Sequence, residues 1–350
     1  MNTKTTKFLK SAGFVLLAIF VLWFLGASEL VDYKQFGRAF VSNPQTIAMI
    51  VILQCIVLAF FSMRFWLILK LFRLTPTFKA VLSANCVSSA IGQWMPAALA
   101  VQETIRLGLM FGTEKANKND KPISKSTLFM ASIHDRIVGF TCILVLGSMA
   151  SVFLLMRLSP GDSQSTLSHE SVLFLGGLSL LLAMILIAAP YVLNSRIGKA
   201  LLSAVMGLRP SFFQKIKAEQ LSKEWSTYGR IHKNLPVFAL SLLALLVGPL
   251  TLVLSSHALG GNIDFGVALL VSPVLAIVTL LPISFGGIGG AQFAAAGLFV
   301  FLGLDPQVAA SASLLQATLS LLCTTLMGLA FLPTSYLQVR SLLKTKRQAL

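Results

Sequence analysis

Leu281-Pro282-Ile283-Ser284-Phe285-Gly286-Gly287-Ile288-Gly289-Gly290 interrupts the apolar stretch Phe265–Leu304, and a second interruption has the same chemistry. In that earlier case, Ser88-Ser89-Ala90-Ile91-Gly92-Gln93-Trp94-Met95-Pro96 lies inside the stretch Phe78–Arg106. Pro removes a backbone donor and Gly removes the Cβ atom, so a helix is weakest at such positions. Within a bilayer, irregular backbone survives only where protein buries it or where it lines a wet cavity. Paired interruptions in two halves of a chain therefore point to a binding site near the middle of a membrane.

The composition of the whole chain agrees with a membrane location. Of the 350 residues, 56% are hydrophobic and 11% are charged, whereas soluble proteins carry about 25% charged residues. We predict an all-α, polytopic integral membrane protein in which residues 1–350 form a single transmembrane domain. A crossing needs about 20 apolar residues. The candidate full spans are Ser11–Ala27, Thr46–Leu67, Ile137–Met156, Ser171–Asn194, Leu235–His257 and Ala309–Leu332.

The Lys and Arg residues predict how these spans are oriented. All but three of the 28 basic residues fall on one side of the predicted topology, and the exceptions are Lys34, Arg38 and Arg157. Basic residues accumulate on the cytoplasmic side, so both termini are expected there, in a bacterial cytoplasmic membrane.

The same charge pattern distinguishes the two interrupted segments. Basic residues flank the first on both sides, so it is expected to enter from the cytoplasm and return as a hairpin. Asp264 and Asp305 flank the second, which is therefore expected to enter and return from outside, either as a re-entrant pair or as two short spans. Six spans with two opposed hairpins suggest an inverted repeat. The alternative is a bundle of eight to ten simple helices with Pro kinks.

Residues 196–234 have a character of their own. Eight basic residues fall in this range, and Leu208–Ile231 places its large apolar side chains within one half of a helical wheel. This pattern predicts a basic cytoplasmic amphipathic segment lying on an anionic leaflet, within the transmembrane domain. A solvated linker is the alternative.

Few ionisable residues are expected at membrane depth, and each is a candidate for function. Arg106 and Arg136 are the best candidates for holding an anionic group, because a guanidinium offers a fork of donors that suits phosphate. Each has a structural alternative. Glu103 lies one turn from Arg106 on the same helix face, and Arg136 could pair with a nearby acid. Asp135 points away from its neighbour Arg136 and could pair with an arginine from another segment.

The two interruptions supply the remaining candidates. Exposed amides within Gly286–Gly290 could bind an anion, although close packing against another helix explains the same spacing of small residues. The full set predicted to bind substrate is Arg106, Arg136, Asp135, Glu103, Gln93, Pro96, Pro282, Ser284, Gly286, Gly287, Gly289 and Gln292.

Signatures of soluble enzymes and of metal sites are absent from the sequence. It contains no Gly-x-Ser-x-Gly, His-Glu-x-x-His or nucleotide-binding loop, so we predict no catalytic residue, metal or cofactor. The charge of +16 follows membrane topology, so nucleic acid is not an expected partner.

The regions singled out above also resemble a known family, the transmembrane region of bacterial lysylphosphatidylglycerol synthase/flippase proteins and their stand-alone relatives. Pro96 with Glu103 and Arg106, then Asp135-Arg136, then Leu281–Gly289 carry the resemblance. Three departures stand out: Gln102 replaces a Gly, Asp135 replaces a Glu, and Gln292 stands where the family places Glu. The loss of that last carboxylate weakens the case for a cationic headgroup such as lysyl.

The resemblance implies lipid translocation without the synthase activity. The expected function is therefore a flippase for a lipid or lipid-linked sugar, or an accessory to one, with a membrane phospholipid or polyprenyl-linked glycan in a groove between the broken helices. One alternative is an integral glycosyl- or acyl-transferase that uses Asp135 or Glu103 as a base. The other is a structural partner of an envelope-biosynthesis complex. The sequence does not predict the oligomeric state.

Overall fold

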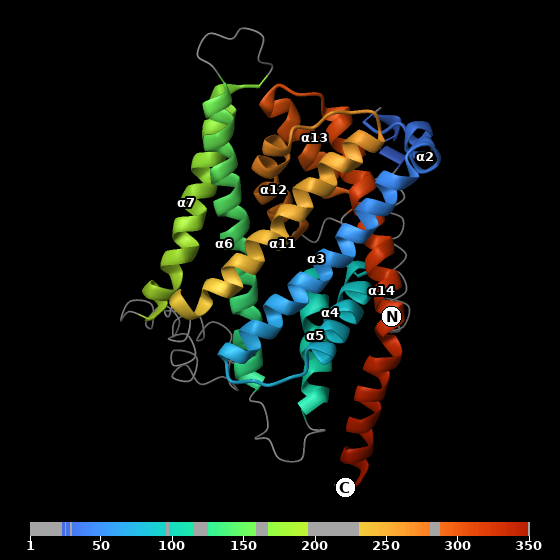
Figure 1. The fold of residues 1–350 in the computed structure, drawn as a ribbon, viewed down its shortest axis with the longest axis vertical. Coiled ribbons are helices and arrows are strands. Elements are labelled where there is room, and N and C mark those ends of the chain that lie inside the picture. The colour runs from blue at the N-terminus through green and yellow to red at the C-terminus, as the bar shows by residue number, and fades with distance from the viewer. Residues whose placement is uncertain are drawn as a thin grey trace, which may run out of the picture.

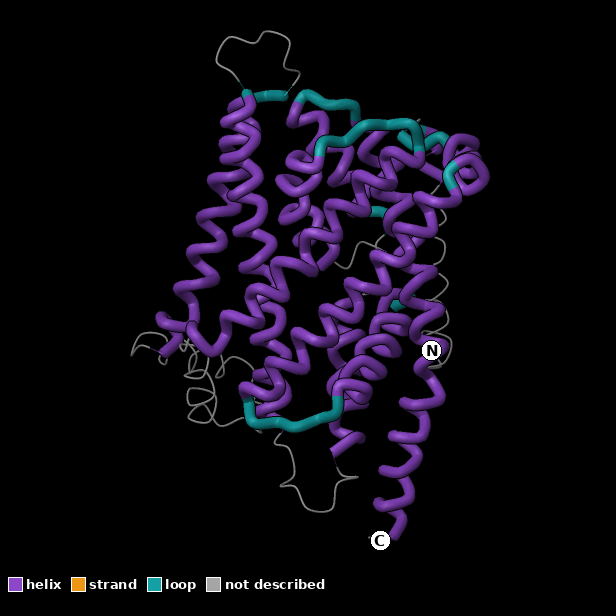
Figure 2. The backbone as a smooth tube through the Cα atoms, viewed as in Figure 1, coloured by secondary structure: helices purple, strands orange, loops and turns teal. Residues whose placement is uncertain are grey.

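The structure is a computed structural model, and it describes residues 23–24, 26–28, 30–95, 98–114, 125–158, 167–194, 231–280 and 288–348. Within these ranges the regular elements are helices, which confirms the predicted all-α class. Figure 2 shows that most of the loops lie at the two ends of the helical bundle. The helices are α2 (Tyr33–Ser42), α3 (Pro44–Leu71), α4 (Phe78–Gln93), α5 (Ala98–Glu114), α6 (Lys125–Arg157), α7 (His169–Asn194), α11 (Ile231–Ala258), α12 (Phe265–Leu280), α13 (Gly290–Leu302) and α14 (Pro306–Gln348).

Five of the described helices are long and apolar enough to cross a membrane: α3, α6, α7, α11 and α14. They contain the five predicted spans between Thr46 and Leu332, which are thereby confirmed. The 28 residues of α3 give a length of about 42 Å, more than the roughly 30 Å of a hydrocarbon core. Most of the sixth predicted span, Ser11–Ala27, lies outside the described residues, as does nearly all of the predicted amphipathic segment Leu208–Ile231.

The two interrupted segments form helical hairpins that enter the bundle from opposite ends (Figure 1). Helices α4 and α5 have 16 and 17 residues and pack against each other at the lower end of the view. Helices α12 and α13, with 16 and 13 residues, pair at the upper end. A helix of 16 residues is about 24 Å long, too short to cross the core. The predicted pair of opposed re-entrant hairpins is therefore confirmed, and the inner ends of their helices lie near the middle of the bundle (Figure 1).

The order of the helices repeats with inverted direction. A first unit consists of α3, the hairpin α4–α5, and α6; a second consists of α11, the hairpin α12–α13, and α14. The units interlock crosswise, because α4 packs on α14, α12 packs on α6, and the two leading spans α3 and α11 pack on each other. Helix α7 pairs with α6 outside this arrangement. The structure therefore has the inverted repeat that the opposed hairpins suggested.

Small residues let each hairpin approach the span of the other unit. A Cβ atom added at Gly328 of α14 would lie 2.2 Å from the Cβ of Ala90 on α4. In the corresponding contact of the other unit, a Cβ added at Gly147 of α6 would lie 2.5 Å from Cγ of Pro273 on α12. Close backbone approach at small residues is typical of helix packing in membranes. Both hairpins are thus held tightly against a full span.

Candidate functional site

Three helices bring five charged side chains together inside the first unit. Asp135 on α6 is at the centre, and it is 1% exposed. Its Oδ1 accepts a hydrogen bond of 2.7 Å from Nε of Arg64 on α3, and its Oδ2 accepts one of 3.1 Å from Nη1 of Arg106 on α5. Both arginines are almost fully buried, at 4% and 3% exposure. The expectation that Asp135 pairs with an arginine from another segment is confirmed.

Glu103 on α5 extends the cluster by pairing with two arginines. Its Oε2 accepts from Nη2 of Arg106 at 2.6 Å and from the hydroxyl of Ser132. Its Oε1 accepts from Nε of Arg136 at 2.7 Å and also from Nη2 of that arginine. Arg106 and Arg136 therefore both pair with an acid, as their structural alternatives predicted. We call Arg64, Glu103, Arg106, Asp135 and Arg136 the arginine cluster.

Neighbouring side chains fix the two buried guanidinium groups in place. The guanidinium of Arg106 lies 3.7 Å from the ring centroid of Phe65, and that of Arg64 lies 5.0 Å from the centroid of Phe61. Such cation–π contacts are attractive, and more so where water is excluded. Asn85 on α4 contributes a carbonyl oxygen 3.4 Å from Nη1 of Arg106. The hairpin α4–α5 and two full spans together determine the geometry of the cluster.

The arginine cluster carries more positive than negative charge. Three guanidinium groups face two carboxylates, which leaves one positive charge in excess. Nε of Arg106 is buried without a hydrogen-bond partner, and the structure gives the Nη atoms of Arg64 no hydrogen bond to a described residue. The side chain of Arg136 is 30% exposed. An uncompensated charge at membrane depth is costly, so this site favours the arrival of an anion.

A cavity of about 280 Å³ opens directly onto the arginine cluster. Arg64, Arg106, Asp135 and Arg136 line it, together with Asn85 and apolar side chains from α3, α5, α6, α11 and α12. Charged donors therefore face an open volume that is otherwise mostly apolar. We call this space the arginine cavity.

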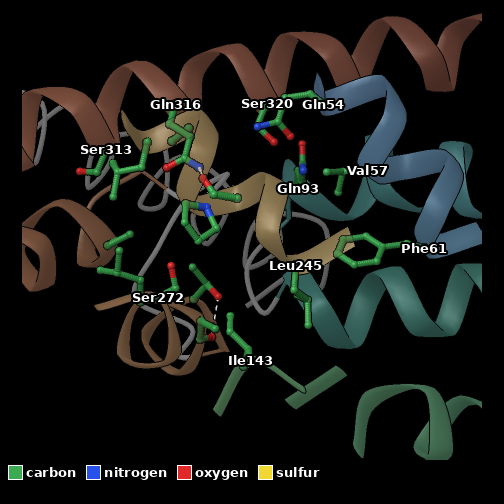
Figure 3. Close-up of a pocket in the computed structure, with 18 of the residues that line it drawn as sticks. Gln54, Val57, Phe61, Gln93, Ile143, Leu245, Ser272, Ser313, Gln316 and Ser320 are labelled. Carbon is green, nitrogen blue, oxygen red and sulfur yellow. Dashed lines mark hydrogen bonds between the residues drawn. The ribbon is translucent and has the colours of Figure 1, made fainter. Parts of the chain in front are cut away.

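A second cavity of about 440 Å³ lies beside the first, and Figure 3 shows its lining. The two share lining residues, among them Phe61, Leu99, Gln102 and Thr279. The ends of both hairpins reach this larger space, which Gln93 lines from α4 and Thr279 from α12. We call it the central cavity, because it lies between the two hairpins.

The predicted binding residues meet four different outcomes. Arg106, Arg136, Asp135 and Glu103 come together in the arginine cluster, while Gln93 and Gln292 line the central cavity. Gly289, with a φ of 113°, precedes α13, and its N–H donates to the amide oxygen of Gln292. Gln292 therefore also closes the start of α13. The other predicted residues, Pro96, Pro282, Ser284, Gly286 and Gly287, lie outside the described residues.

The sequence reasoning missed Arg64. It was counted with the basic residues of the cytoplasmic side, but the structure buries it against Asp135, so its side chain belongs to the site and not to a solvated surface. One signal was available: Arg64 falls within the apolar run Thr46–Leu67, on the inner side of the last turns of α3. An arginine inside a span is a candidate for function by default.

Gly139 on α6 gives the guanidinium of Arg64 its space, and this makes a test of the geometry. A Cβ atom added there would lie 3.1 Å from Nη1 and 3.5 Å from Nη2 of Arg64. We expect Gly139→Leu to displace Arg64 and to lower the affinity of the arginine cluster for an anion by about tenfold, the loss of roughly one charged hydrogen bond. Gly108→Leu, at a position with open space on α5, is the matched control. Titration of the purified variants with a phosphodiester measures both affinities, and equal values would show that Arg64 does not contribute.

Comparison of the sequence with known proteins shows the family to which this chain belongs. The family model of the lysylphosphatidylglycerol synthase TM region matches residues 11–328. A UPF0104 membrane protein of Pyrococcus horikoshii is 24% identical over 332 residues, which cover 90% of this chain and 92% of that protein. No solved structure matches the chain. Because the family match includes every helix of both inverted units, apart from the end of α14, the chain belongs to the lysylphosphatidylglycerol synthase transmembrane-region family.

Proposed function

We propose that this multi-pass membrane protein binds lipids whose headgroup carries one negative charge, and that it moves this headgroup across the membrane. The observation that carries the proposal is the single excess positive charge of the arginine cluster, buried in the bundle and open to a cavity. A bound monoanion neutralises this charge.

The chemistry of the donors favours a phosphodiester. A guanidinium presents a planar fork of N–H groups that matches phosphate oxygens, and hydrogen bonds between two charged groups are about twice as strong as neutral ones. Arg64 and Arg136 both face the arginine cavity from different helices. A phosphodiester placed between them can accept from both, and it carries the one charge that the cluster lacks.

The arrangement of the two cavities provides a route for the headgroup. A translocated lipid must keep its headgroup out of the acyl chains while its tails stay in lipid. The arginine cavity lies between the first hairpin and its spans, and it adjoins the central cavity between both hairpins. Relative movement of the two hairpins, each together with the full span on which it packs, would expose this shared space to each side in turn, as in transporters built from inverted repeats.

The same contacts argue against the transferase alternative. A general base needs a carboxylate that is free to take a proton from the substrate. Both oxygens of Asp135 accept from arginines, and both oxygens of Glu103 accept from arginines as well. These carboxylates hold the guanidinium groups in position, so we infer transport rather than group transfer.

We further infer that the end of the bundle at which α5 ends and α6 begins faces the cytoplasm. Lys70 in the last turn of α3, Arg73 in the loop that follows and Lys79 in the first turn of α4 lie at this end, where the positive-inside rule expects basic residues. The headgroup would then enter the arginine cavity from the cytoplasmic side of a bacterial cytoplasmic membrane. The basic range 196–234 would lie on the same surface, within one transmembrane domain.

Translocation in proteoliposomes tests the proposal. Vesicles with and without the protein receive phospholipids that carry a label on one acyl chain and differ in headgroup charge. A reductant that cannot cross the membrane then reports the fraction in each leaflet. We expect the protein to accelerate exchange of labelled phosphatidylglycerol, which carries one negative charge, far more than that of zwitterionic phosphatidylcholine. Equal rates for both lipids, or no acceleration of either, would refute the proposal.

A further inference from the structure

The central cavity has polar side chains set among apolar ones, and none of the described residues that line it carries a charge. Five glutamines reach it from five helices, which is unusual for an apolar bundle. Figure 3 shows Gln54, Val57 and Phe61 entering from α3, and Gln316 and Ser320 from α14. The polar lining residues are Gln54, Gln93, Gln102, Gln292, Gln316, Ser272, Ser313, Ser320 and Thr279.

Two of these amides form hydrogen bonds through their nitrogen atom only. Nε2 of Gln316 donates to the carbonyl oxygen of Gly248 at 2.8 Å and to Oγ1 of Thr251 at 2.7 Å. Nε2 of Gln102 donates to Oγ of Ser89 at 2.7 Å. The amide oxygens of these two glutamines accept no hydrogen bond from the part of the chain that the structure describes. They are therefore oriented acceptors at the cavity wall.

Other side chains leave donors available. The amide oxygen of Gln93 accepts a hydrogen bond from Oγ1 of Thr324, so its Nε2 remains available as a donor. Gln54 forms no hydrogen bond to any residue that the structure describes, and its side chain is half-buried. A primary amide offers two donor hydrogens and an oxygen with two lone pairs. Both donors and acceptors are thus available around one space of about 440 Å³, a volume within the usual range for ligand sites.

This chemistry selects among the substituents that a phosphodiester can carry. An ammonium group would find no carboxylate among the lining residues that the structure describes, and a second phosphate would find no arginine or lysine among them. Burying either charge without a partner is costly. Hydroxyl groups both donate and accept, so they can replace the hydrogen bonds that these amides make to water. A purely apolar substituent would leave the amides unpaired.

We propose that the central cavity binds an uncharged, hydroxyl-bearing substituent of the headgroup, a polyol or a glycosyl group, while its phosphate stays at the arginine cluster. The two cavities adjoin, because Gln102, Thr279 and several apolar residues line both, so one headgroup can extend from one into the other. This inference rests on the proposed function, since it needs the phosphate to be held next to the central cavity. It assigns phosphate recognition and substituent recognition to separate groups of residues.

The test uses lipids of equal charge and different substituents. Phosphatidylmethanol, phosphatidylglycerol and phosphatidylinositol are all monoanionic phosphodiesters, but they carry none, two and five free hydroxyls on the substituent. Native mass spectrometry of the purified chain measures their relative binding. Gln54→Leu removes a wall amide without breaking any hydrogen bond between described residues, and Gln45→Leu, at an exposed position on the same helix, is the matched control.

We expect the wild-type chain to prefer the hydroxyl-bearing lipids over phosphatidylmethanol. Gln54→Leu should reduce this preference by about threefold to tenfold, the effect of one neutral hydrogen bond, and should leave phosphatidylmethanol binding unchanged. Gln45→Leu should change neither. Stronger binding of phosphatidylinositol than of phosphatidylglycerol would indicate that the cavity accepts a ring-sized group. Equal binding of the two would indicate a short polyol, and both results support the inference.

Three results would overturn the inference. The wild-type chain could bind phosphatidylmethanol as tightly as the hydroxyl-bearing lipids, or Gln54→Leu could weaken the binding of all three lipids equally. The third is tighter binding of lysylphosphatidylglycerol than of phosphatidylglycerol. The variant Arg136→Ala shows whether such a result refutes only the role of the central cavity or also the proposed function. If Arg136→Ala weakens all three lipids, the phosphate site stands whatever Gln54→Leu does. If it weakens none, the phosphate site itself is refuted.

Discussion

Arg136→Ala is expected to abolish translocation of anionic headgroups while leaving the fold intact. The substitution lowers the charge of the arginine cluster to neutrality, so the cluster no longer needs an anion. It also removes a guanidinium that faces the arginine cavity and is 30% exposed. Charged hydrogen bonds contribute about 1.5–3 kcal/mol, so the initial rate should fall by at least about tenfold. The leaflet-exchange measurement with labelled phosphatidylglycerol gives this rate.

Two companion variants make this result specific. Arg157→Ala removes an arginine from the same helix that is largely exposed and pairs with Asp264 at 3.4 Å, so transport should be unchanged. Arg136→Lys keeps the charge without the planar fork and should retain part of the activity. Stability should change little in Arg136→Ala, because Glu103 keeps Arg106 and Ser132 as partners. Normal transport by Arg136→Ala would remove Arg136 from the site.

Asp135→Asn is expected to cause the largest loss of stability. The carboxylate is almost completely buried and neutralises charge on both Arg64 and Arg106. Its removal leaves three guanidinium groups facing Glu103 alone, and breaking a buried pair by removing one partner costs about 3–5 kcal/mol. Unfolding of the detergent-solubilised protein, followed by heat or denaturant, should show this decrease. Asp264→Asn, at an exposed ion pair, should cost about 1 kcal/mol or less.

A second substitution separates charge imbalance from lost packing. Adding Arg64→Met to Asp135→Asn returns the cluster to one excess positive charge and fills much of the space of the arginine side chain. We expect the double variant to be more stable than Asp135→Asn alone, with a coupling energy of about 1 kcal/mol or more. If the double variant is less stable than Asp135→Asn, and the costs of the two substitutions simply add, the Arg64–Asp135 pair does not stabilise the protein through its charge.

Most of the fold was predictable from the sequence because it depends on local rules. Pro and Gly within Leu281–Gly290 and Ser88–Pro96 weaken the helix there, and the charges at each flank place both ends of a broken segment on one side. These two facts predicted opposed hairpins, and the short helices α4, α5, α12 and α13 confirm them. The crosswise contacts of α4 with α14 and of α12 with α6 were not predictable, because they depend on close approach at Gly328 and Gly147.

The site was predicted less completely than the fold. Glu103, Arg106, Asp135 and Arg136 were found because charged residues are rare in this chain and each stands near an apolar run. Arg64 was missed because the positive-inside rule accounts for an arginine near the end of a span without reference to depth. The role of Gln54 was missed for a different reason. A single glutamine in an apolar run carries no signal, and its meaning appears only when five helices bring five amides to one cavity.

Mass spectrometry of lipids that copurify with the chain tests the central claim most directly. The wild-type protein and Arg136→Ala are purified in parallel from the same membranes, with Arg157→Ala as the control. The account predicts that a lipid with a single anionic phosphodiester is enriched with the wild-type and Arg157→Ala proteins and is depleted from Arg136→Ala. The same enrichment of that lipid in all three proteins, or enrichment of zwitterionic lipids only, would contradict it.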